Sequence, residues 1–198
     1  MHVYSVYMRT RSSCTKKWHK TCLLYGMHNA FIAVDTETSA LSFRHGGRVI
    51  EVAAIRVEQG EIVDEFSSLI NTATPISASA YRVHGISTSM LVGQPPPQQV
   101  WTHFQQFVGS TPLVAHNAPF DRTFIGNELA SLGTTLRNAW HCTVAMARLR
   151  LPSLPNHRLE TIYRHYFGEL PPFVSTHRAL TDARMVARIW GQWKKNFQ

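Results

Sequence analysis

A short apolar run, Phe31–Val34, ends directly in two acidic residues, Asp35 and Glu37. Four consecutive apolar residues bounded by polar ones predict a buried strand. Alternate residues of a strand point to the same side, so the carboxylates of Asp35 and Glu37 are expected to face one spot. The sequence therefore predicts a pair of acidic side chains at the mouth of a buried strand.

Two carboxylates in that position repel each other and lose hydration unless a cation lies between them. Oxygen ligands suit a hard divalent ion, so Mg²⁺ or Mn²⁺ is the cofactor that this pair favours. An isolated Asp-x-Glu is more often a solvated strand end than a metal site. The metal interpretation of Asp35 and Glu37 therefore depends on further acidic groups elsewhere in the chain.

Two such groups occur at predicted helix starts. The segment His116–Asp121 (HNAPFD) follows an apolar strand, Leu113–Ala115, and opens a helix, so Asp121 lies in the first turn, where the helix dipole favours an acid. The segment His177–Asp182 (HRALTD) begins the C-terminal helix. If His177 and Asp182 both lay in the helix, their side chains would point ~140° apart around its axis and could hardly serve one site. We therefore expect His177 in the preceding loop, swinging toward the acids, and Asp182 one turn into the helix.

The remaining pattern predicts a meander of strands followed by alternating strands and helices. Strands are expected at Val49–Val57 and Ile62–Ile70, joined as a hairpin through Gln59-Gly60, and at Ala139–Thr143. Helices are expected within Ser77–Val92, after Pro95–Pro97, and at Phe120–Leu132, Val144–Leu149, Leu159–Phe167 and Arg178–Trp193. This order indicates a mixed-sheet α/β domain.

Composition limits the class of protein. A chain of 198 residues with 44% apolar residues suits one domain with a full core. Polar residues interrupt every apolar stretch before the ~18–20 residues that a membrane span needs, so no membrane partner is expected. Three cysteines are an odd number without paired spacing, which favours a reducing, cytoplasmic location over a disulfide framework.

The charge is unevenly spread along the chain. The net charge is +8, and residues 1–30 hold five of the 20 Lys and Arg residues and none of the 12 acidic ones. A basic balance favours a polyanionic partner such as nucleic acid, because neutralising phosphates releases counterions. The modest excess in the remainder is also explained by solubility alone.

The basic segment 1–29 is set apart from a domain spanning 30–198. Three interpretations remain open: a targeting segment, a nucleic-acid-binding arm, or upstream sequence before a true start at Met27. We favour the last, because Met27 lies just before the first convincing strand.

Three segments resemble, in order, the three motifs of the DEDDh (DnaQ-like) 3′→5′ exonucleases: Phe31–Leu41 (FIAVDTETSAL), His116–Asp121 and His177–Asp182. The likeness is greatest to the proofreading epsilon subunit of bacterial DNA polymerase III and its stand-alone relatives. It covers about residues 30–190 and includes Val83–Ile86 (VHGI), which is similar to an internal segment of that subgroup.

The resemblance implies a ribonuclease H-like fold, a mixed five-stranded sheet flanked by helices in a single domain, with two Mg²⁺ or Mn²⁺ ions. By that resemblance Asp35, Glu37 and Asp182 bind the metal that activates water. Asp35 also reaches the second ion, which Asp121 helps to hold partly through water. His177 resembles the general base, and an imidazole with a pKa near 6.5 suits that role at neutral pH.

The resemblance also implies substrate contacts. His84 would touch the terminal nucleotide, the Thr36 backbone would bind its 3′ hydroxyl, and Leu41 would wedge against the last base or, alternatively, pack ordinarily. Thr38-Ser39-Ala40 replaces the Thr-Thr-Gly common in the first motif, and Ser79 stands where an acidic contact is expected. The chain ends at Gln198 without the polymerase-docking extension, which favours a stand-alone nuclease.

The predicted function is a two-metal 3′→5′ exonuclease that removes nucleoside 5′-monophosphates from single-stranded, frayed or mispaired DNA ends, with a DNA polymerase as a possible partner. Two alternatives remain: an exoribonuclease, and a non-catalytic nucleic-acid-binding domain on the same fold. The complete set of four acids and one histidine favours an enzyme. The oligomeric state stays open.

Overall fold

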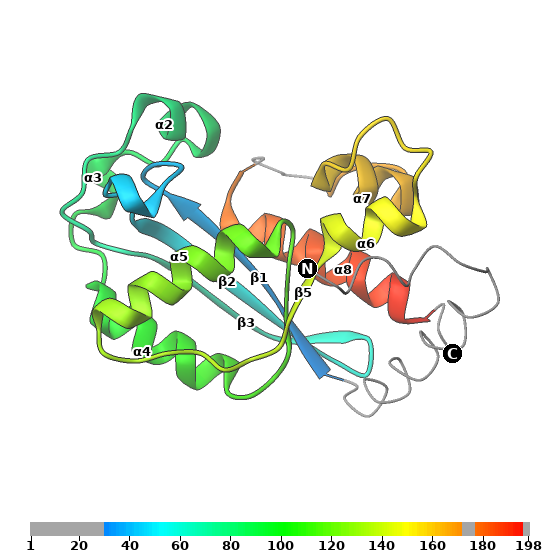
Figure 1. Ribbon diagram of the computed structural model, residues 1–198, viewed down its shortest axis with the longest axis horizontal. Coiled ribbons are helices and arrows are strands. Elements are labelled where there is room, and N and C mark those ends of the chain that lie inside the picture. The colour runs from blue at the N-terminus through cyan, green and yellow to red at the C-terminus, as the bar shows by residue number, and fades with distance from the viewer. Residues whose placement is uncertain (1–29, 172–176, 196–198) are drawn as a thin grey trace, which may run out of the picture.

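The centre of the molecule is a five-stranded mixed sheet with the strand order β3-β2-β1-β4-β5 (Figure 1). The computed structural model describes residues 30–171 and 177–195, so the basic segment 1–29 lies outside the described residues. The strands are β1 (Ala30–Thr38), β2 (Val49–Glu58), β3 (Glu61–Leu69), β4 (Leu113–Ala115) and β5 (Trp140–Cys142). The first three pair antiparallel, and β4 and β5 continue parallel to β1, as expected for the predicted fold.

Helices cover both faces of this sheet. They are η1 (Phe43–His45), α2 (Ala78–His84), α3 (Thr88–Leu91), α4 (Pro97–Val108), α5 (Ala118–Ser131), α6 (Thr143–Arg150), α7 (Leu159–Phe167) and α8 (Ala179–Lys195). One core, between the sheet and α4 and α5, contains Trp101, Phe104 and Phe124. The other, between the sheet and α7 and α8, contains Tyr163, Ile189 and Trp193.

The central strand β1 supplies alternate residues to these two cores. Ile32 and Val34 belong to the core beneath α4 and α5, while Phe31 and Ala33 belong to the core beneath α8. Continuing this alternation places Asp35 and Glu37 on the α8 side and Thr36 on the α5 side. The sequence prediction of a buried strand is confirmed, although the strand runs through the acidic pair to Thr38.

The predicted hairpin is also present. Gln59 and Gly60, both with positive φ (53° and 89°), connect β2 to β3. Two left-handed residues give the turn whose twist matches that of the two strands. This short connection fixes β3 beside β2. On its other side β2 pairs with β1, and there Glu51 lies directly opposite Glu37.

Within the described ranges, none of the helices combines the length and the apolar composition that crossing a bilayer requires.

Candidate active site

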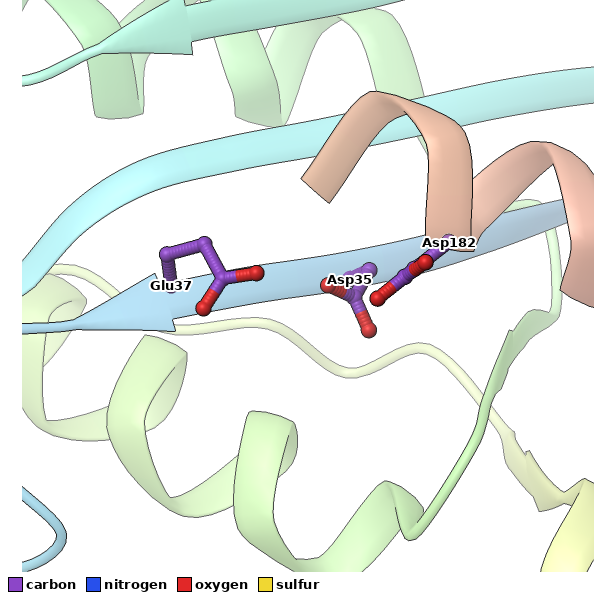
Figure 2. A group of neighbouring side chains, drawn as sticks. All are labelled: Asp35, Glu37 and Asp182. Carbon is purple, nitrogen blue, oxygen red and sulfur yellow. The ribbon is translucent and has the colours of Figure 1, made fainter. Parts of the chain in front are cut away.

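Three acidic side chains meet at the carboxyl end of β1. Ligand oxygens of Asp35, Glu37 and Asp182 all lie within 4.8 Å of one another. Figure 2 shows Asp35 and Glu37 on β1, with Asp182 reaching them from the first turn of α8. Residues separated by nearly 150 positions in sequence therefore form one cluster, which is what the motif positions predicted.

The helix α8 carries Asp182 to this cluster because its first turn begins beside β2. The backbone N–H of Asp182 donates to the carbonyl of Arg178 at 3.1 Å, so Asp182 lies in the first helical turn. The buried face of α8 continues through Ala183, Val186 and Ile189 against the sheet. Packing of that apolar stripe sets the helix on β1 and leaves its N-terminal acid facing Asp35.

Asp121 lies beside the cluster and approaches β1 from its other side. It is buried in the first turn of α5, which follows the left-handed residue Asn117 (φ 68°). The hydroxyl of Thr36 donates to Asp121 Oδ1 at 2.9 Å. Because Thr36 faces α5 while its neighbours face α8, the strand end joins acids from both helices.

Burial and mutual repulsion disfavour ionisation of these acids. The pKa of Asp35 is raised well above its usual value, first by burial and then by the charges of Asp121, Asp182 and Glu37. Burial, followed by repulsion from Asp182, raises the pKa of Glu37 to about 8. Burial likewise raises the pKa of Asp121 to about 7, although the hydrogen bond from Thr36 opposes the shift.

Burial also raises the pKa of Asp182 to about 7, and the negative charges of Glu160 and Glu51 add to this rise. Buried carboxylates that cannot all ionise together accept a cation readily, because the ion replaces the repulsion by attraction. The donor set of Asp35, Glu37 and Asp182 consists of hard oxygens only, which fits Mg²⁺, Mn²⁺ or a similar ion.

His177 lies outside the helix, as predicted. It is exposed and adopts a left-handed backbone conformation (φ 66°) two residues before α8 begins. The acidic cluster does not include it. Burial lowers the pKa of His84, the other histidine predicted to belong to the site.

Of the predicted substrate residues, Thr36 and His84 are buried, and their side chains form hydrogen bonds to other residues of the protein. His84 Nδ1 accepts from the backbone N–H of Ile86 at 3.0 Å, which leaves Nε2 protonated and facing the carbonyl of Thr38 at 3.3 Å. His84 therefore connects α2 to the end of β1. Its predicted contact with a nucleotide stays a prediction.

Leu41 is 81% exposed, just beyond the end of β1. The alternative of ordinary packing for this side chain is therefore wrong. An exposed leucine that follows β1 is compatible with the predicted wedge, which stays a prediction.

Sequence reasoning missed two buried glutamates that hold the helices of the site. Glu51 binds Arg178 and the N-terminus of α8, and Glu128 binds Arg48 and the N–H of Val49. Glu51 carries a sequence signal, because it interrupts an otherwise apolar run within β2. A charge inside a buried strand needs a partner, but the sequence does not say which one.

Comparisons with known proteins agree with this geometry. Residues 32–190 match the family model RNase_T, described as Exonuclease. A DNA polymerase III of the PolC type from Halalkalibacterium halodurans is 35% identical over 164 residues, which are 82% of this chain and 11% of that protein. The chain thus spans about a tenth of the length of such relatives.

Solved structures show the same fold. Exonuclease X in complex with 5′ overhanging duplex DNA matches with a TM-score of 0.70 and 29% identity, over 84% of this chain and 92% of that one. Escherichia coli Exonuclease I with a bound oligonucleotide matches with a TM-score of 0.71 and 16% identity, over 84% and 40% of the two chains. The second likeness concerns the fold alone.

Proposed function

The chain belongs to the exonuclease family described by the RNase_T model, and from this membership we propose that it removes nucleotides from the 3′ end of DNA with the help of two divalent ions. The products are nucleoside 5′-monophosphates. The single observation that carries the proposal is the meeting of Asp35, Glu37 and Asp182 within 4.8 Å, in an enzyme of a nuclease family.

Asp35, Glu37 and Asp182 are proposed to hold one ion, and Asp35 with Asp121 the second. When bound, such a pair of ions supplies an activated water and charge stabilisation for the leaving 3′ oxygen. The protein's part is to fix the carboxylates before the ions arrive. Thr36 does this for Asp121 through its hydroxyl, and the β1 backbone does it for Asp35 and Glu37.

His177 is proposed as the general base that takes the proton from the attacking water. Its exposure to solvent supports this role, because a base must exchange its proton with solvent after each turnover. Imidazole is the side chain that proteins use most often for this kind of proton transfer.

The preference for DNA is proposed from two relatives. The PolC-type protein is a DNA polymerase, and the Exonuclease X structure contains a DNA duplex with a 5′ overhang, an arrangement whose 3′ end is recessed. Single-stranded, frayed or mispaired 3′ ends are the proposed substrates. Cytoplasmic location and association with a polymerase stay predictions.

The test uses one oligonucleotide labelled at its 5′ end, with Mg²⁺ or excess EDTA. Digestion from the 3′ end shortens the labelled strand stepwise, whereas digestion from the 5′ end releases the label at once. We expect a stepwise ladder with Mg²⁺ and none with EDTA. The variant Asp182→Asn, purified identically, controls for contaminating nucleases, since it keeps the size of the side chain and loses its charge.

The same assay separates the alternatives. Faster digestion of RNA of the same sequence would assign the chain to exoribonucleases. Undiminished digestion in EDTA would contradict the metal-dependent mechanism.

A further inference from the structure

An ion pair between buried Glu51 and partly exposed Arg178 joins β2 to the residue just before α8. Glu51 is buried, and its carboxylate accepts from Arg178 Nε at 3.1 and 3.0 Å and from Arg178 Nη2 at 2.6 Å. The backbone N–H of Ala179, the first residue of α8, donates to Glu51 Oε2 at 3.1 Å. The glutamate thus satisfies an N–H that has no partner within the helix.

These bonds set Glu51 apart from the metal-binding acids. It pairs directly with Glu37 across the two strands, so its side chain begins on the same face of the sheet. Both of its oxygens nevertheless accept from Arg178, and one of them also from the helix N–H. A carboxylate engaged in this way supports a neighbouring element and leaves the ions to Asp35, Glu37 and Asp182.

The backbone of Arg178 connects Glu51 to two residues of the proposed site, Asp182 and His177. Its carbonyl accepts from the N–H of Asp182 at 3.1 Å, and its backbone follows directly on His177. His177 has a φ of 66°, a conformation that costs free energy for a residue with a side chain and persists only where the surroundings fix it. Arg178, whose side chain is bound by Glu51 of β2, supplies such a fixed neighbour for His177.

Building on the proposed nuclease function, we propose that Glu51 and Arg178 are positioning residues that hold Asp182 and His177 in register with the acids of β1. Catalytic groups lose rate when displaced by a fraction of an ångström. The pair joins α8 to the neighbouring strand at its N-terminal end, where such a displacement matters most.

Two variants and two controls test this role. Glu51→Gln removes the charge and keeps the shape, and Arg178→Lys keeps the charge and loses the fork of donors. Glu65→Gln is the first control. Glu65 of β3 forms an exposed ion pair with Arg184 of α8, so this variant also removes an ion pair between the sheet and α8. Ile189→Ala is the second, because it removes buried apolar surface from α8 two turns beyond Asp182.

Three quantities are measured: kcat and KM on single-stranded DNA with Mg²⁺, the affinity for Mn²⁺ without DNA, and the melting temperature. For Glu51→Gln we expect kcat to fall ~10–100-fold and Mn²⁺ binding to weaken ~10-fold, as for other groups that orient metal ligands, with KM little changed. Arg178→Lys should lie between this variant and the wild type. Glu65→Gln should change none of the three, and Ile189→Ala should lower only the melting temperature.

The proposal is overturned if Glu51→Gln keeps the kcat of Ile189→Ala, or if its Mn²⁺ affinity equals that of the wild type. Should Glu51→Gln fail to fold, the same comparison with Arg178→Lys, whose altered side chain is 35% exposed, decides the matter. If the wild type digests no DNA, the proposed function fails. The Mn²⁺ affinities then still decide the positioning role, since equal values in all variants overturn it.

Discussion

Individual residues at the end of β1 owe their chemistry to strand alternation. Asp35 and Glu37 face α8, and Thr36 between them faces α5 and holds Asp121. Each carboxylate is costly to ionise in this setting, since burial and its neighbours act in the same direction. Two predictions concern single groups of this site, one for the proposed base and one for the acids.

Replacing His177 by alanine should lower kcat ~10²–10⁴-fold, because general-base catalysis contributes a factor of that order. Binding of single-stranded DNA should stay within a factor of ~2, measured with Ca²⁺ in place of Mg²⁺. The matched control is His103→Ala, which removes an exposed histidine of α4. An unchanged kcat in His177→Ala would remove this residue from the mechanism.

Without metal, the melting temperature should fall as the pH rises from about 4.5 to 8. The folded protein keeps protons on Asp121 and Asp182 up to a pH of about 7 and on Glu37 up to about 8. The unfolded chain releases them near pH 4. Protonated carboxyls therefore stabilise the fold at low pH, and this contribution is lost as the pH approaches the folded-state values.

Thermal unfolding in EDTA at constant ionic strength measures this dependence. Asp182→Asn should flatten it, because the variant has one carboxylate fewer to ionise, and Mn²⁺ should raise the melting temperature of the wild type most at high pH. A melting temperature that rises between pH 5 and 8 in EDTA would contradict the description of the site as a repulsive cluster.

At the scale of elements, β2 binds each of the two helices that carry site residues. Glu51 fixes the start of α8, and Glu128 of α5 accepts from Arg48 Nε at 2.8 Å, from Arg48 Nη2 at 2.7 Å and from the N–H of Val49 at 3.1 Å. Glu128 lies two turns beyond Asp121 on the same helix. These ion pairs complement the apolar contacts that place the helices on the sheet.

Replacing Glu128 by alanine should lower the free energy of unfolding by about 2–4 kcal/mol, because it leaves the buried N–H of Val49 without its partner and removes a bidentate ion pair whose carboxylate is buried. Urea unfolding followed by tryptophan fluorescence measures the change. Glu65→Ala, which breaks an exposed pair, should cost less than ~1 kcal/mol. Equal costs for the two variants would show that the pair at Glu128 contributes nothing beyond a surface contact.

The sequence predicted those helices, strands and turns that depend on residues close together in the chain. The apolar run of β1, the hairpin at Gln59-Gly60 and the first turn of α5 depend only on neighbouring residues. The position of His177 outside α8 also followed from helix geometry, since it could not share a face with Asp182.

What the sequence could not predict depends on contacts between distant segments. Glu51 and Arg178 lie 127 residues apart, and neither has a local reason to pair with the other. That Asp121 lies beside the cluster of three acids, instead of within it, depends on how α5 packs against the sheet. Short-range patterns do not contain this information.

At the scale of the whole molecule, five of the eight net positive charges belong to the N-terminal segment, which lies outside the described residues. Residues 1–30 carry five Lys and Arg residues and no acid. A segment that grips DNA contributes to the salt dependence of binding in proportion to the phosphates it neutralises. The role of the segment can therefore be measured without a structure of it.

If the basic segment contacts no phosphate, a chain beginning at Met27 should bind single-stranded DNA with the affinity and salt dependence of the full chain. Five phosphate contacts would contribute about 3–4 to the slope of log K against log salt concentration. A slope flatter by that amount in the shortened chain would assign the basic segment to DNA binding instead.

The proposed mechanism requires the cluster at the end of β1 to bind two divalent ions. Anomalous diffraction from crystals grown with Mn²⁺ and a nucleoside 5′-monophosphate tests it most directly. We predict two peaks ~3.5–4 Å apart, both in contact with Asp35. An empty cluster under those conditions, or manganese bound only elsewhere on the molecule, would contradict the account.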